Sequence, residues 1–116
     1  MVNSVQSLIL QLIESTSFNH IEGITIVRDL RANTNLWSSV MSGSKASCIF
    51  PLRDIPKNQW NVDTLYILSS SQDNIALETI AKSWNPSRIH WMSADEAGKY
   101  LRTFPFHHRI LCLRWE

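Results

Sequence analysis

A serine-rich segment is the first place in this sequence where side chains could bind a ligand. Ser69, Ser70 and Ser71 end a short apolar run, and Asp73 and Asn74 follow them. Hydroxyls and backbone amides that converge between a strand and a helix can hold an anion. The segment contains no glycine, which phosphate-binding loops use to bring the backbone close to phosphate. We favour a helix-capping role for these residues, with a small-ligand or phosphate-binding enzyme as the alternative.

Histidine and cysteine residues near the end of the sequence could form a catalytic or metal site. His107 and His108 are adjacent, and Cys112 follows them. Adjacent residues of a strand point to opposite faces, so the two histidines would not share a metal ion there. No further cysteine or histidine pair with zinc-site spacing completes a ligand set, and no GxSxG-type motif presents a nucleophile. The sequence therefore predicts no catalytic residue, no metal and no cofactor, and it favours a protein that is not an enzyme.

Tryptophan and arginine are prominent in this chain. It has five tryptophans, and its arginines outnumber its lysines. Trp37 and Trp60 lie in or beside segments that read as loops, where no core is evident. Tryptophan and arginine are enriched at the energetic centres of protein interfaces. We therefore predict a partner-binding surface that contains Trp37, Trp60, Arg53 and Arg31.

A second cationic locus lies near the end of the sequence. It consists of Arg102, His107, His108, Arg109 and Arg114. Such side chains among aromatic residues can bind single-stranded nucleic acid. However, the formal net charge of the chain is only +1, and electrostatic capture of nucleic acid needs an excess of clustered cations. A nucleic-acid-binding accessory protein is therefore a second alternative that is not favoured.

Short apolar runs alternate with helical spacing from residue 64 to residue 116. The predicted elements are a strand at 64–68, a helix at about 74–84, a strand at 88–92, a helix at about 94–104 and a strand at 109–115. This alternation is typical of a mostly parallel sheet covered by helices, and it predicts a Rossmann-like βαβαβ core. Ser93 and Glu96 match the capping box that begins a helix.

The first half of the chain adds a helix and two strands to this prediction. Val5, Leu8, Ile9, Leu12 and Ile13 recur at helical spacing after Ser4, which predicts a core-facing helix. Residues 24–30 are rich in β-branched side chains and read as a strand. Residues 31–45 read as either a short helix or a loop. Residues 46–50 read as a strand that Pro51 restricts to an edge or ends.

Length and composition favour one domain over residues 1–116. The alternation of strands and helices predicts that it is a small α/β domain with about five strands in a mostly parallel or mixed sheet. The chain is 44% hydrophobic and 18% charged, as is usual for globular proteins. Cys48 and Cys112 lie in apolar stretches and read as buried thiols of a reduced protein. The first residues show no basic leader, and no apolar run is long enough to cross a membrane. These features predict a cytoplasmic protein without membrane contact.

The function that these features favour is a non-catalytic protein-interaction module. Such a module could be a small adaptor, an accessory subunit or an inhibitor, and its partner would be another protein or a second copy of the chain. The favoured contact residues are tryptophan and arginine. The sequence offers no recognisable catalytic motif and no glycine-rich ligand-binding loop that would favour another function.

Overall fold

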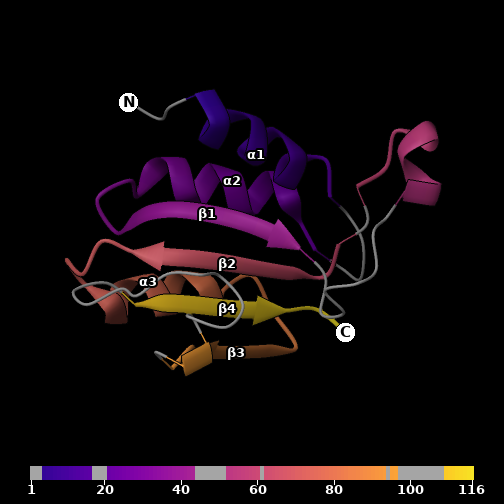
Figure 1. Ribbon diagram of the computed structural model, residues 1–116. Coiled ribbons are helices and arrows are strands. Elements are labelled where there is room, and N and C mark those ends of the chain that lie inside the picture. Colours follow the sequence, from indigo (N-terminus) through magenta and orange to yellow (C-terminus); the bar gives the residue numbers. More distant parts are fainter. Residues whose placement is uncertain (1–3, 17–20, 44–51, 61, 94, 97–108) are drawn as a thin grey trace.

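The computed structural model describes residues 4–16, 21–43, 52–60, 62–93, 95–96 and 109–116 (Figure 1). In these ranges the elements follow one another in the order α1 (Ser4–Glu14), α2 (Gly23–Ala32), β1 (Trp37–Gly43), the 3₁₀ segment η2 (Leu52–Lys57), β2 (Thr64–Ser69), α3 (Asn74–Lys82), β3 (Arg88–Trp91) and β4 (Ile110–Arg114). The described part of the chain is thus a small α/β unit built on a four-stranded sheet.

The sheet is antiparallel throughout, so the predicted fold class is wrong. Its strand order is β1-β2-β4-β3, and every neighbouring pair is antiparallel. β2 and β3 do run in the same direction, because each is antiparallel to β4, and α3 connects them. However, β4 lies between them, so the last strand reverses direction and no Rossmann-like βαβαβ core forms. The alternation of strands and helices along a sequence does not specify where the last strand inserts.

The segment predicted as a strand at residues 24–30 is instead the helix α2. Its β-branched residues favour a strand locally. Its buried residues, however, are Gly23, Ile26, Val27 and Leu30, which recur at the spacing of one helix face. Packing of this face against the core therefore outweighs the local preference for extended backbone.

Residues 31–43, the described part of the segment 31–45, form neither the predicted short helix nor a long loop, because α2 continues to Ala32 and β1 occupies Trp37–Gly43. β1 pairs with β2 and has an irregular register between Trp37 and Ser39. Trp37 and Val40 are both buried, and the irregularity lets side chains three positions apart face the core. The predicted strand at 46–50 lies outside the described residues, as does most of the predicted helix at 94–104.

Local signals placed the remaining elements correctly. α1, β2, α3, β3 and β4 all occur where the sequence predicts them. Asp73 caps α3, since its carboxylate accepts a hydrogen bond from the backbone N–H of Ala76 at 2.9 Å. The capping box is also present: the N–H of Ser93 donates to Glu96 Oε1 at 3.3 Å, and the N–H of Glu96 donates to Ser93 Oγ at 3.2 Å.

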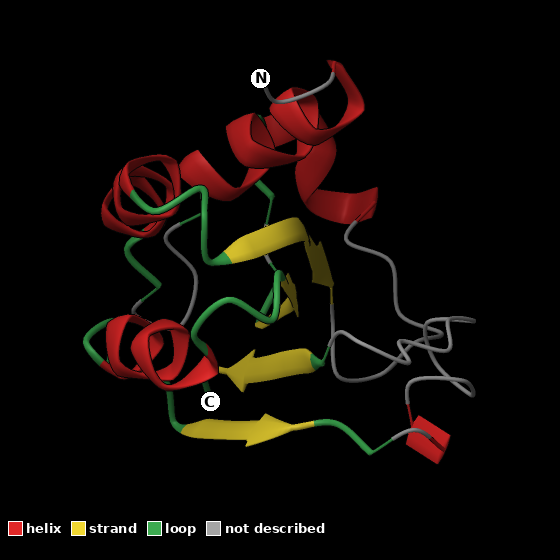
Figure 2. Ribbon diagram, turned by 90° about the vertical axis from the view of Figure 1, so that its left-hand side faces the viewer, coloured by secondary structure: helices red, strands yellow, loops and turns green. Residues whose placement is uncertain are grey.

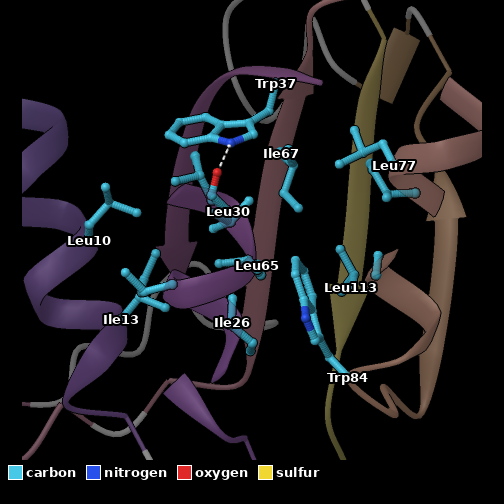
Figure 3. Close-up of a cluster of buried hydrophobic side chains, with 14 of the residues drawn as sticks. Leu10, Ile13, Ile26, Leu30, Trp37, Leu65, Ile67, Leu77, Trp84 and Leu113 are labelled. Atoms are coloured by element: carbon cyan, nitrogen blue, oxygen red, sulfur yellow. Dashed lines mark hydrogen bonds between the residues drawn. The ribbon is translucent and has the colours of Figure 1, made fainter. Parts of the chain in front are cut away.

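The helices and the sheet form two layers with the core between them. α2 and α3 lie on one side of the sheet, and α1 lies beside the edge strand β1 (Figure 2). The core side chains come from all of these elements; Figure 3 labels Leu10, Ile13, Ile26, Leu30, Trp37, Leu65, Ile67, Leu77, Trp84 and Leu113. None of α1, α2 and α3 lies on the opposite face of the sheet.

Candidate functional site: an apolar stripe on the first helix

The rotation of α1 about its own axis is determined by the side chain of Gln6. Its Nε2 donates to the carbonyl of Val40 at 2.9 Å, and its Oε1 accepts from the N–H of Val40 at 3.0 Å. β1 is an edge strand, so these backbone groups point away from β2 and need another partner. The Gln6 amide supplies that partner and is itself buried. α1 is therefore attached to the sheet along one particular side.

Close backbone contact holds the end of α1 as well. Leu10 and Ile13 are buried in the core on the same side as Gln6. The first residue of α2, Gly23, lies so close to α1 that a Cβ atom there would be 1.9 Å from the Ile13 carbonyl oxygen. The N–H of Gly23 also donates to the carbonyl of Thr16 at 3.1 Å. These contacts leave little freedom for α1 to turn another face toward the core.

A second apolar side of α1 faces the solvent. Val5, Leu8 and Leu12 are 66%, 61% and 42% exposed. Their spacing of i, i+3 and i+7 puts them on one face of the helix, within roughly 60° of one another. We call these three residues the α1 stripe. Adjoining apolar side chains at the surface of a protein are typical of contact sites.

The α1 stripe carries no charge. From Ser4 to Ile13 the helix contains no ionisable side chain. Glu14, which lies nine positions after Val5 and therefore on the opposite side of the helix, forms an ion pair with Arg31 at 3.6 Å. An apolar partner can therefore cover the stripe without burying an unpaired charge.

The residues predicted to bind a partner do not form one exposed patch. Trp37 is only 6% exposed, and its Nε1 donates to the carbonyl of Leu30 at 2.7 Å, so its indole belongs to the core (Figure 3). Trp60 is partly buried, and its Nε1 donates to Ser42 Oγ at 3.0 Å. Trp37 and Ser42 lie near opposite ends of β1, which keeps the two indoles apart. Arg31 is exposed beside Glu14, and the side chain of Arg53 lies outside the described parts.

The serine segment uses its polar groups to hold backbone together. Ser69 is fully buried, and its Oγ accepts from the N–H of Arg109 at 3.1 Å. Ser70 Oγ donates to the carbonyl of Asn35 at 2.6 Å and accepts from the N–H of Gln72 at 3.3 Å. These bonds join the end of β2 to the segments before β1 and β4. They favour a structural role for the two hydroxyls.

In the rest of this segment, one buried side-chain atom has no hydrogen-bond partner. Ser71 is exposed with a φ of 64°, and Asp73 is occupied as the cap of α3. Asn74 Oδ1 is shielded from solvent and has no hydrogen-bond partner. An amide oxygen does not attract an anion, so this atom does not support a phosphate site.

A cysteine, a histidine and a glutamate lie together on the face of the sheet away from α2 and α3. Cys112 is opposite His90 in the β3–β4 register, and His90 Nε2 is 3.5 Å from Glu96 Oε2. A cysteine nucleophile needs a lowered pKa and access to substrate. Cys112 is only 4% exposed, and burial raises the pKa of its thiol. These three residues therefore do not form an active nucleophile.

The pKa of Glu96 is lowered for a structural reason. The largest cause is the hydrogen bond from the backbone N–H of Ser93, and the charge of His90 contributes further. Both interactions favour the carboxylate form. The carboxylate therefore serves the capping box and is not shifted toward a general-acid role.

A small apolar pocket lies where the ends of α1 and β1 meet the sheet. The space open to the centres of water molecules is about 10 Å³, which is room for about one water molecule. The lining residues are Ile13, Thr16, Ile21, Ile26, Ser42, Val62, Thr64, Leu65 and Trp115. Thr16 Oγ1 donates a hydrogen bond to the carbonyl of Trp60, and Ser42 Oγ accepts one from the indole N–H of Trp60. The polar atoms that could orient a ligand are therefore already bonded within the protein.

The parts of the chain that the structure describes show no metal site. No group of three or more histidine, cysteine or acidic side chains is close enough to hold a metal ion in these parts. His107 and His108 lie outside them. The helices of the described ranges are all too short or too polar to span a membrane.

Comparison with known proteins adds no relative. No family model, no curated protein and no solved structure matches this chain.

The exposed stripe is the feature that sequence reasoning missed. The predicted core stripe contained Val5, Leu8, Ile9, Leu12 and Ile13. Ile13 is buried and Ile9 is partly buried, whereas the other three face the solvent. Leu10, which lay outside the predicted stripe, is almost fully buried. The signal was present, because apolar residues on α1 occupy more of its circumference than one core-facing side needs.

Proposed function

We propose that this chain is a non-catalytic protein-interaction module that associates with a second copy of itself through the α1 stripe. The observation that supports this function is the exposure of Val5, Leu8 and Leu12 on a helix whose opposite contacts hold it in place. Removing these side chains from water is favourable. Turning α1 inward to achieve this would break both hydrogen bonds between Gln6 and Val40.

The distribution of charge favours a second copy as the partner. A two-fold interface places the same surface against itself, so a charged surface would repel its own copy. The α1 stripe has no charge and avoids this repulsion. Leu8 lies between Val5 and Leu12, so a two-fold axis near Leu8 would place Val5 of each copy against Leu12 of the other. The contact would be a pair of antiparallel helices.

The size of the stripe predicts a weak dimer. Complete burial of a valine or leucine side chain contributes roughly 1.5–3 kcal/mol, and the three stripe side chains are already partly buried. Association costs at least about 4 kcal/mol in lost translational and rotational freedom. We therefore expect a reversible dimer that dissociates on dilution into the low micromolar range.

Sedimentation velocity over a concentration series tests this function. The wild-type chain should shift from monomer to dimer as its concentration rises, and Leu8→Glu should stay monomeric with an unchanged circular dichroism spectrum. Ile75→Glu is the matched control, because Ile75 is 78% exposed on α3, away from the stripe. This control should dimerise like the wild type. A wild-type chain that stays monomeric at millimolar concentration, or equal effects of the two substitutions, would refute the proposal.

A further inference from the structure

The α1 stripe lies on the side of its helix that faces away from α2. Gln6 faces the edge of β1, because its amide bonds to Val40. At about 100° per residue, Glu14 lies about 80° to one side of Gln6, where it forms the ion pair with Arg31 of α2. Val5 lies about 100° to the other side of Gln6. The edge of β1 is therefore between α2 and the stripe around the circumference of α1.

This position directs the stripe toward the second face of the sheet, by which we mean the face opposite α2 and α3. Those two helices lie on one side of the sheet, and α1 lies beside the edge strand β1 (Figure 2). The stripe therefore borders the second face along β1. Ile9 occupies the position between Gln6 and Val5 around the helix and is partly buried against the core.

Met41 is the large apolar side chain that β1 presents on the second face. Val40 is buried in the core, and successive side chains of a strand alternate between faces. Met41 therefore points to the second face, where it is 52% exposed and has Tyr66 of β2 opposite it. Because Val40 is also the residue that bonds to Gln6, Met41 lies next to the attachment of α1. Apolar surface thus continues from the α1 stripe across the edge of the sheet.

The two elements that form this surface are uncharged. α1 has no ionisable side chain from Ser4 to Ile13, and β1 has none from Trp37 to Gly43. A second copy can therefore cover the stripe and Met41 without burying a charge of either element. Two identical uncharged surfaces also do not repel each other across a two-fold axis.

We propose that the surface through which two copies associate extends from the α1 stripe across the edge of β1 to Met41. This inference rests on the proposed function, in which the stripe is the centre of a two-fold dimer. A two-fold axis perpendicular to the paired helices places Met41 of both copies on the same side of the helix pair. The flexible thioether of methionine adapts to irregular apolar contacts, so each Met41 packs against the other copy.

Sedimentation velocity of Met41→Gln tests this extension. Glutamine is about as long as methionine but replaces its apolar end by an amide. We expect the dissociation constant of the dimer to rise about tenfold, because a two-fold dimer loses the contact twice. Ile75→Gln is the matched control, since Ile75 is an exposed apolar residue of α3, and it should dimerise like the wild type. Circular dichroism checks that both variants are folded.

Nuclear magnetic resonance of the full chain with ¹³C-labelled methionine methyl groups gives a second measurement. The Met41 signal is assigned by its absence from Met41→Gln. It should shift as the concentration of the wild type rises and stay constant in Leu8→Glu. The Met92 signal should stay constant in both, because Met92 follows β3 at the opposite edge of the sheet.

The extension and the proposed function can fail separately. The extension is overturned if Leu8→Glu abolishes the wild-type dimer but Met41→Gln dimerises as tightly as Ile75→Gln, or if the Met41 signal does not shift when the wild type dimerises. The proposed function stands in both cases. A wild-type chain that stays monomeric at millimolar concentration refutes both.

Discussion

The side-chain amide of Gln6 on α1 bonds to both backbone groups of Val40 on β1. The Gln6 amide thereby takes the hydrogen-bonding position that a further strand would occupy beside β1. Unpaired edge groups are templates for pairing with other chains, and proteins commonly cover them. Here one glutamine covers part of the edge and also orients the helix that carries the exposed stripe.

Replacement of Gln6 should destabilise the protein more than replacement of an exposed glutamine does. Gln6→Ala removes both hydrogen bonds and leaves the buried N–H and carbonyl of Val40 without their partner. We expect the free energy of unfolding to fall by about 2 kcal/mol, measured by urea denaturation. Gln11→Ala, an exposed glutamine of the same helix, should change it by less than about 0.5 kcal/mol. Similar losses in the two variants would contradict this role of Gln6.

Gly23 should not tolerate a side chain, whereas Gly43 should. A Cβ at Gly23 would lie 1.9 Å from the Ile13 carbonyl oxygen, so backbone would have to move. At Gly43 the nearest atom is the Tyr66 Cε2 atom at 3.6 Å, an ordinary contact. We expect Gly23→Ala to cost about 3 kcal/mol or more, and Gly43→Ala less than about 1 kcal/mol. Thermal and urea denaturation of both variants test this difference, and a stable Gly23→Ala protein would show that α1 and α2 can separate.

Cys112 should be protected from alkylation in the folded protein. Its thiol is buried, and burial raises its pKa, so little reactive thiolate is present near neutral pH. We expect iodoacetamide to modify it slowly until urea unfolds the chain, as followed by peptide mass spectrometry. A Cys48→Ser background leaves Cys112 as the single thiol. Modification of the folded protein at the rate of a free thiol would contradict its burial.

Glu96 should contribute stability that acid removes. Its folded-state pKa lies below the ordinary value of 4.5, chiefly because it accepts the Ser93 backbone N–H. The contribution is therefore fully present above the unfolded-state pKa and is lost as the pH falls through the folded-state pKa. Glu96→Gln should reduce the difference in unfolding free energy between about pH 6 and about pH 3.

Ser93→Ala is the informative comparison for Glu96. It removes the serine hydroxyl but keeps the backbone N–H that lowers the pKa most. Most of the part of the pH dependence that Glu96 contributes should therefore survive in Ser93→Ala and be absent from Glu96→Gln. Equal pH dependence in the wild type and Glu96→Gln would show that the carboxylate has the same pKa in the folded and unfolded chains.

Local sequence was sufficient to predict the helices and strands that are specified by residues close together in the chain. The cap at Asp73 and the buried residues Leu77 and Ala81 define α3, and the capping box joins Ser93 to Glu96. β2 and β4 are short apolar runs that form strands as predicted. These features depend on hydrogen bonds and side-chain periodicity inside one segment, which the amino-acid order alone specifies.

Tertiary contacts decided the features that join distant segments. The burial of Val27 and Leu30 made residues 23–32 a helix despite their β-branched character. Pairing of Leu65 with Leu113 placed β4 between β2 and β3 and made the sheet antiparallel. The two hydrogen bonds between Gln6 and Val40 decided which side of α1 faces the solvent. Sequence periodicity describes each segment alone, whereas strand order and helix rotation follow from the pairing of segments that lie far apart in the chain.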